Sequence, residues 1–99
     1  MIIQEPAQYR LSVPLRRVAE PSLPIRFAFG RAVRRLRTAA GQSEEQCGAR
    51  AGLHPIHVVA LERGEYPVTL VVLERLAIAL EMPVSVLLRE AEREQERVR

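Results

Sequence analysis

An all-α fold of five helices is predicted by three features of this 99-residue sequence. Apolar residues recur every three or four positions from Phe29 to Leu88, which is the period of an amphipathic helix. Glycine or proline interrupts that pattern at intervals typical of short helices. Ser or Thr stands directly before several of the periodic stretches, where a helix cap is expected. The length allows one domain with short extensions.

The first two helices are predicted on either side of Gly41. Phe29, Val33, Leu36 and Ala40 step by four, three and four positions, so they line one helical face. Gly41 ends this helix in the usual C-terminal position.

Residues 43–46 read Ser-Glu-Glu-Gln, the pattern of a capping box in which Ser43 and Gln46 satisfy each other's backbone amides. The second helix then runs through Cys47 to Ala51 and closes at Gly52. Small Gly48 and Ala51 favour a close approach of the next helix.

Three further helices are expected after Gly52. His54-Pro55 opens the third, because proline is favoured in a first helical turn, and Gly64 ends it. The fourth follows Thr69 and is broken by Met82-Pro83. The fifth is expected to begin at Ser85 as a cap. Residues 89–99 form a charged tail with Arg and Glu three positions apart, which we expect to be a frayed helical extension.

Residues 1–28 are predicted to be an arm, because four prolines there exclude a long helix. Within it, Tyr9, Leu11, Val13 and Leu15 occupy every second position, the period of one short strand with a single buried side. Such a lone strand must pack on the domain, pair with a copy of itself or stay mobile. We therefore divide the chain into an arm (1–28), a helical domain (29–89) and a charged tail (90–99).

The charge is distributed unevenly. Fifteen Arg and no Lys stand against twelve Glu and no Asp. Residues 30–40 hold four Arg and no acid, whereas residues 41–99 carry a net charge of −3. This asymmetry suits a protein that presents one face to a polyanion. The absence of Lys is equally what codon usage in a GC-rich genome produces.

Several classes of protein are not expected. The sequence holds no apolar run of about 18 residues that would span a membrane, and Glu5 and Pro6 interrupt the order of a signal peptide. A single cysteine makes no internal disulfide. Cys47, His54 and His57 lack a fourth ligand for zinc at a suitable spacing. We therefore expect a cytoplasmic protein that is not an enzyme and has no cofactor, metal, membrane partner or small-molecule substrate.

Residues 27–89 resemble the Cro/repressor-type (Xre-type) helix-turn-helix family. The resemblance is carried by Leu36-Arg37, Gly41, Ser43, Glu45, Ala51-Gly52, Val58, Leu61-Glu62-Arg63-Gly64-Glu65, Leu73, Leu76-Ala77, Leu80 and Leu87-Leu88. It implies a five-helix, repressor-like domain whose third helix enters the major groove while the second crosses the DNA backbone. It also implies a partly buried structural ion pair between Arg37 and Glu62.

The resemblance places two sets of residues on double-stranded DNA. The base-facing positions are Pro55, Ile56, Val59 and Ala60, with His54 and His57 beside them. The backbone-facing positions are Arg34, Arg35, Ser43, Glu44, Arg50 and Arg63. Two features depart from the family pattern: the base-facing positions are mostly carbon, and a carboxylate at Glu44 would repel the phosphate that family members bind there.

Two functions follow from these residues. One is a sequence-specific DNA-binding transcriptional regulator, a dimeric repressor or controller, with dimer contacts at Val84, Val86 and Leu87 or through the strand of the arm. The other is a helix-turn-helix module that binds a protein partner through its apolar third helix, as an accessory or antagonist of another regulator. An exposed apolar face is typical of protein interfaces, so both hypotheses stay open at this point.

Overall fold

The computed structural model describes residues 23–97, which form five helices and, within that range, no strand. The helices are α2 (Ile25–Ala39), α3 (Glu44–Ala51), α4 (Pro55–Glu62), α5 (Leu70–Ala79) and α6 (Val84–Arg97). The predicted all-α, five-helix fold is confirmed for this part of the chain. The strand expected at residues 9–15 lies outside the described residues.

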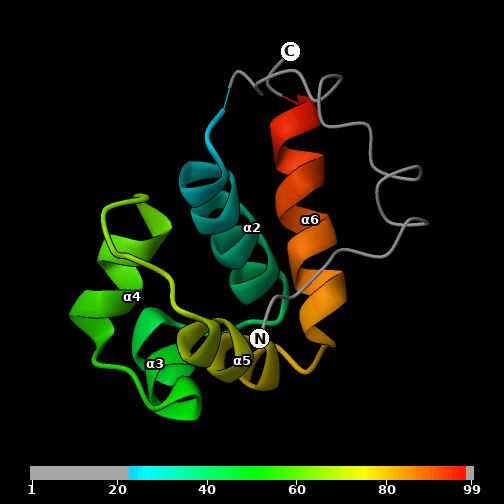
Figure 1. Ribbon diagram of the computed structural model, residues 1–99. Helices are drawn as coiled ribbons and strands as arrows, with labels where there is room; N and C mark the ends of the chain where they lie inside the picture. Colours follow the sequence, from blue (N-terminus) through cyan, green and yellow to red (C-terminus); the bar gives the residue numbers. More distant parts are fainter. Residues whose placement is uncertain (1–22, 98–99) are drawn as a thin grey trace, which may run out of the picture.

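The long helices α2 and α6 lie side by side, and α3, α4 and α5 close the other end of the molecule (Figure 1). α3 packs on both α4 and α5, and α4 also contacts α2. The core at the centre of these contacts is built from Phe29, Val33, Cys47, Leu61, Leu76 and Leu87, all with at most 3% of their surface exposed. Burial of this apolar surface is the main term that holds the five helices together.

Helix α2 begins four residues before the expected Phe29. Pro24 occupies the cap position, and its carbonyl accepts the backbone N–H groups of Phe27 and Ala28 at 3.0 and 3.1 Å. A proline there costs no hydrogen bond, because the first amides of a helix have no intrahelical partner. The proline-rich composition that suggests an arm up to residue 28 therefore ends at residue 24.

Helix α6 begins at Val84 and continues to Arg97, so Ser85 is not its cap and residues 90–97 are not a frayed extension. The carbonyl of Pro83 accepts the first amides of the helix. Ala91 is fully buried and Glu94 is only 7% exposed. The tail is therefore ordered by packing against α2, a tertiary contact that its charged composition does not reveal.

The turn between α3 and α4 is set by two glycines. Gly52 caps α3 with φ 69°, ψ 32°, the left-handed region that non-glycine residues rarely adopt. A Cβ atom on Gly48 would lie 2.6 Å from the carbonyl oxygen of Leu53, which is too close for any side chain. These two positions let α3 and α4 pack tightly enough to act as one unit.

Candidate nucleic-acid interface

Helices α3 and α4 form the helix-turn-helix unit, and a side chain caps the beginning of each; the capping box at Ser43 is the one expected from the sequence. Ser43 Oγ accepts the Gln46 N–H at 3.1 Å, and Gln46 Oε1 accepts the Ser43 N–H at 2.8 Å. His54 Nδ1 accepts the backbone N–H of Ile56 at 3.2 Å, with Pro55 in the first turn. The beginnings of both helices are thereby fixed, which is where a major-groove reader makes its contacts.

Arg37 and Glu62 join α2 to the end of α4. Arg37 donates from Nε to Glu62 Oε2 at 2.6 Å and from a terminal nitrogen to Glu62 Oε1 at 3.0 Å. The two side chains are only 10% and 6% exposed. The hydrogen bonds that Arg37 donates to Glu62 raise the pKa of Arg37, against the opposing effect of burial. This two-point contact lies where the resemblance implied an ion pair.

The same arginine reaches the turn between α2 and α3. Its second terminal nitrogen donates to the carbonyl of Gln42 at 2.9 Å. Gln42 Nε2 in turn donates to the Ala79 carbonyl on α5 at 3.1 Å. One buried polar network thus joins α2, α4 and α5 to the turn between α2 and α3, and it fixes α4 relative to the rest of the domain.

The outer surface of α4 is apolar, but fewer of its apolar side chains are fully exposed than the sequence predicts. Ile56 is 63% exposed, and His57 is also exposed, whereas Pro55, Val59 and Ala60 are only partly exposed. Val58 and Leu61 point into the core, with 0% and 1% exposure. Ile56 and His57 are therefore the two side chains of α4 most available to a ligand.

The ring of His57 stacks on the ring of Tyr66, with centroids 4.8 Å apart and planes 20° from parallel. Tyr66 follows α4 in the chain and packs against the core. Tyr66 lies in the loop after α4, and the contact joins residues nine positions apart across the end of a helix. Nothing in the periodicity of the sequence signals such a stack.

Of the four arginines predicted to contact phosphates, three are exposed and one is held by carboxylates of α6. Arg34, Arg50 and Arg63 are exposed, and Arg50 makes only a long, exposed contact of 3.9 Å with Glu81. Arg35 instead donates to Glu90 at 2.7 Å and to Glu94 at 2.8 Å on α6. These hydrogen bonds raise the pKa of Arg35, and the one to Glu90 has the larger effect. Arg35 thus ties α2 to α6 and is occupied by two carboxylates.

A hollow of about 250 Å³ separates α2 from the beginning of α3 and the end of α4. Arg34 and Arg63 line it together with Glu44 and Glu62. Glu62 is neutralised by Arg37, but Glu44 has no partner among the described ion pairs. The hollow therefore presents two arginines and one unpaired carboxylate.

The three residues expected at the dimer contact differ in their exposure to solvent. Leu87 is 0% exposed within a single chain, so its assignment to a dimer contact is wrong and it belongs to the core. Val84 is partly buried and packs against the core, whereas Val86 is 39% exposed. The periodicity of residues 86–88 could not tell which face of α6 meets α2.

We find no reactive cysteine, metal-ligand cluster or membrane-spanning helix in residues 23–97. Cys47 is fully buried, and burial raises the pKa of its thiol, as expected of an inert core cysteine. No group of three or more metal-ligating side chains occurs in this range. Within the same residues, none of the helices has the length and apolar character needed to cross a bilayer.

Comparison with known proteins agrees with the resemblance. A family profile described as "Helix-turn-helix domain" matches residues 28–91. A search of curated sequences finds no match. Among solved structures, the restriction-modification controller protein C.AhdI from Aeromonas hydrophila is 39% identical, with 62% of this chain and 92% of that chain covered and a TM-score of 0.60.

Two further structures bear on the fold. The clp gene regulator ClgR from Corynebacterium glutamicum is 27% identical over 79% of this chain and 83% of that chain, with a TM-score of 0.74. The controller protein C.Esp1396I, 18% identical over 74% of this chain and 96% of that chain, has a TM-score of 0.67 and shares the fold. The profile covers well over half of this sequence, and the chain therefore belongs to the helix-turn-helix domain family of DNA-binding regulators.

Proposed function

We propose that this chain is a sequence-specific transcriptional regulator that binds double-stranded DNA as a homodimer, with α4 in the major groove. The observation that carries the proposal is the rigid α3–α4 unit, in which both N-termini are capped and α4 is fixed by the Arg37–Glu62 contact. The similarity to controller and regulator proteins supports a role in controlling transcription.

The phosphate contacts that we propose come from Arg34, Ser43, Arg50 and Arg63. All four are exposed, and they are contributed by α2 and by the two helices of the unit or their caps. Arginine suits this role because its planar group binds two phosphate oxygens at once. Arg35 is excluded from this set, since a phosphate would have to displace both Glu90 and Glu94.

We assign the base contacts to Ile56 and His57. Ile56 can contact a thymine methyl group, and the imidazole of His57 can donate to or accept from a base edge. Pro55, Val59 and Ala60 are partly covered and add only apolar contact at their exposed edges. With one polar reader in each subunit, we expect modest sequence discrimination that depends on two recognition helices acting together.

Dimerisation would place the two α4 helices in successive major grooves, roughly 34 Å apart. We assign this contact to the exposed side of α6, around Val86. A dimer of this type acts as a repressor or as a controller according to where its operator lies relative to the promoter.

Fluorescence anisotropy tests the proposed function. The purified protein is titrated onto DNA from upstream of its own gene and onto a scrambled duplex, at several salt concentrations. Tighter binding to the native duplex, with affinity falling steeply as salt rises, is the expected result. Equal weak binding to both duplexes would contradict sequence reading by α4.

A second candidate function is protein binding through α4, and two observations favour it. α4 carries no Arg or Lys over Pro55–Glu62, and Glu44, at the beginning of α3, forms no ion pair with another residue of 23–97. Ile56 is the exposed centre of this surface. If anisotropy shows no sequence preference, a regulator partner that binds the intact chain and is released by Ile56→Glu would establish this alternative.

A further inference from the structure

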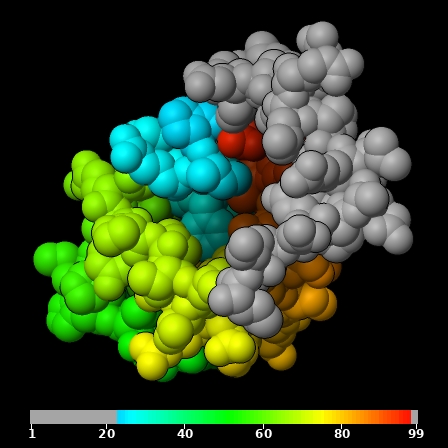
Figure 2. Space-filling model, in the orientation of Figure 1, coloured from blue at the N-terminus to red at the C-terminus, as the bar shows by residue number. Residues whose placement is uncertain are grey.

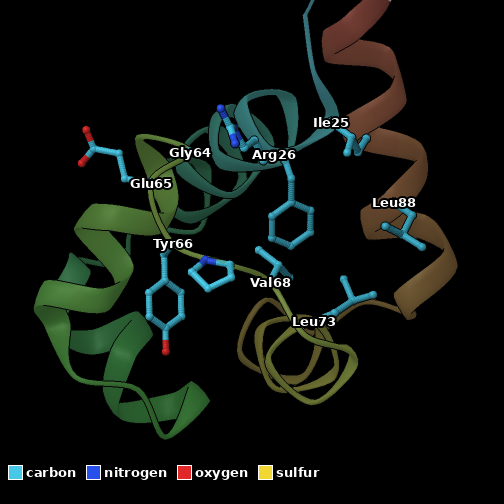
Figure 3. A pocket seen from close by; sticks show the side chains of 10 residues that line it. Ile25, Arg26, Gly64, Glu65, Tyr66, Val68, Leu73 and Leu88 are labelled. Atoms are coloured by element: carbon cyan, nitrogen blue, oxygen red, sulfur yellow. The ribbon is translucent and has the colours of Figure 1, made fainter. Parts of the chain in front are cut away.

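A pocket of about 390 Å³ lies between the beginning of α2, the segment after α4, and helices α5 and α6. It is the hollow that Figure 2 shows between the cyan start of α2, the yellow-green segment and the orange α6. Its apolar walls come from Ile25, Phe29, Tyr66, Val68, Leu73 and Leu88. Figure 3 shows Ile25 and Leu88 on one side of the pocket and Tyr66 on the other.

The pocket has a buried floor and an exposed apolar rim. Phe29 and Leu73 are 3% and 6% exposed, whereas Ile25 and Leu88 are 48% and 40% exposed. Large apolar side chains gathered around a concave site are typical of a surface that another segment covers.

The N-terminal end of the described chain lies next to this pocket. Twenty-two residues precede Leu23 in the sequence, and the carbonyl of Leu23 accepts a hydrogen bond from Gln95 Nε2 on α6 at 3.0 Å. Only two positions later, Ile25 lines the pocket. The preceding segment is therefore attached at the rim.

That segment carries the matching apolar pattern. Tyr9, Leu11, Val13 and Leu15 stand at every second position, so an extended chain would present all four on one side. The eight residues from Leu15 to Leu23 can span roughly 26 Å when extended, which is enough to turn back onto a pocket next to their point of attachment. Because the segment is tethered, its effective concentration at the pocket is high.

We propose that residues 9–15 dock in an extended conformation into this pocket of their own chain, with the four alternating apolar side chains facing Ile25, Val68 and Leu88. The inference uses the pocket, the tether and the sequence pattern, and it does not depend on the function proposed above.

A spin label on Ser12→Cys tests the docking in the full-length protein. Ser12 belongs to the opposite side of the alternating pattern, and Cys47 is too buried to react with the label. We expect the label to broaden the backbone amide signals of Val68, Leu73 and Leu88 in the same molecule. Absence of that broadening would overturn the proposal.

Matched variants separate docking from general effects. Leu11→Glu should abolish the broadening, and Gln8→Glu, which adds the same charge on the other side of the pattern, should leave it intact. Leu88→Glu should also abolish it, whereas Ser85→Glu, at an exposed position on the same helix, should not. Broadening that survives both Leu11→Glu and Leu88→Glu would contradict the assigned contact.

A mixed sample identifies the molecule on which the segment docks. A spin-labelled chain without isotope is combined with an isotope-labelled chain without spin label. Broadening that is absent from the mixture but present in the doubly labelled chain supports docking within one molecule. Broadening in the mixture would show that the segment covers a second copy, and would overturn the proposal as stated.

Discussion

The imidazole of His57 lies nearly parallel to the phenol ring of Tyr66, at a centroid separation of 4.8 Å. Tyr66 is partly buried and anchored on the core, whereas His57 is exposed on α4. The stack therefore restricts the side chain that we assign to base contact, and a restricted side chain loses less conformational entropy when it binds. Under the proposed function, the loop after α4 would thereby take part in DNA recognition.

Replacement of Tyr66 tests this restriction. Tyr66→Ala should weaken binding to the native duplex by about two- to tenfold, the equivalent of an aromatic contact of about 0.5–1.5 kcal/mol. Tyr66→Phe keeps the ring and should bind within about twofold of the intact protein. Anisotropy measures both, and thermal unfolding checks that each variant is folded. Equal loss in the two variants would show that the hydroxyl group, and not the stack, matters.

The neighbouring arginines Arg34 and Arg35 should behave differently towards DNA. Arg34→Ala should reduce the slope of log affinity against log salt by about two, because one phosphate contact is lost from each subunit of the proposed dimer. Arg35→Ala should leave that slope unchanged, since its guanidinium is occupied by Glu90 and Glu94. Salt-dependent anisotropy on one duplex measures both slopes. A reduced slope in Arg35→Ala would mean that phosphate displaces the two glutamates.

Base and phosphate contacts can be separated in the same assay. His57→Ala should relax the preference at one base pair of each half-site, whereas Arg63→Ala should weaken binding to all sequences alike. Binding to a set of duplexes with single base-pair changes measures these patterns. Unchanged affinity in both variants would contradict the assignment of the α4 surface to DNA.

The sequence predicted those features that depend on nearby residues. The capping box at Ser43 and the cap at Thr69 are both present, because a cap depends on groups two or three positions apart. The left-handed turn at Gly52 is likewise local. The Arg37–Glu62 contact spans 25 positions, and only the family resemblance indicated it.

The features that the sequence did not predict depend on how α2 meets α6. Arg35 and Arg34 look alike in sequence, but only Arg35 faces Glu90 and Glu94 across the helix pair. Leu87 lies between two exposed apolar residues and is itself core. The alternating charges of residues 90–97 suggest a solvated tail, yet Ala91 places one face of this segment against α2. A tertiary contact decides each of these cases.

Breaking the Arg37–Glu62 contact should destabilise the domain strongly. Arg37→Met leaves the carboxylate of Glu62 unpaired at 6% exposure and removes the donor to the Gln42 carbonyl. A loss on the order of 3–5 kcal/mol is expected for removing one partner of a buried pair. Urea unfolding measures it. The double variant Arg37→Met, Glu62→Leu should recover part of this loss, and no recovery would argue that Gln42 is the more important partner.

Dimerisation through α6 should respond to a charge at Val86. Val86→Glu should convert a species of twice 11.2 kDa to one of 11.2 kDa, because a carboxylate facing its symmetry mate is costly in an apolar contact. Ser85→Glu adds the same charge at the neighbouring exposed position and should leave the dimer intact. Light scattering after size-exclusion chromatography measures the mass. A dimer that persists in Val86→Glu would place the contact on another surface.

The contact between Arg35 and Glu90 should make stability depend on pH in the acid range. The hydrogen bond from Arg35 holds the pKa of Glu90 below its usual value. Stability from a carboxylate with a lowered folded pKa is present above the unfolded value of about 4.3 and is lost as the pH falls through the folded value. Glu90→Gln should therefore lower the urea midpoint most near neutral pH, and the gap to the intact protein should narrow as the pH falls from the unfolded value through the lowered folded value. Glu92→Gln, at an exposed position on the same helix, should show no such gap. A gap that stays constant with pH would mean that Glu90 contributes through packing and not through its charge.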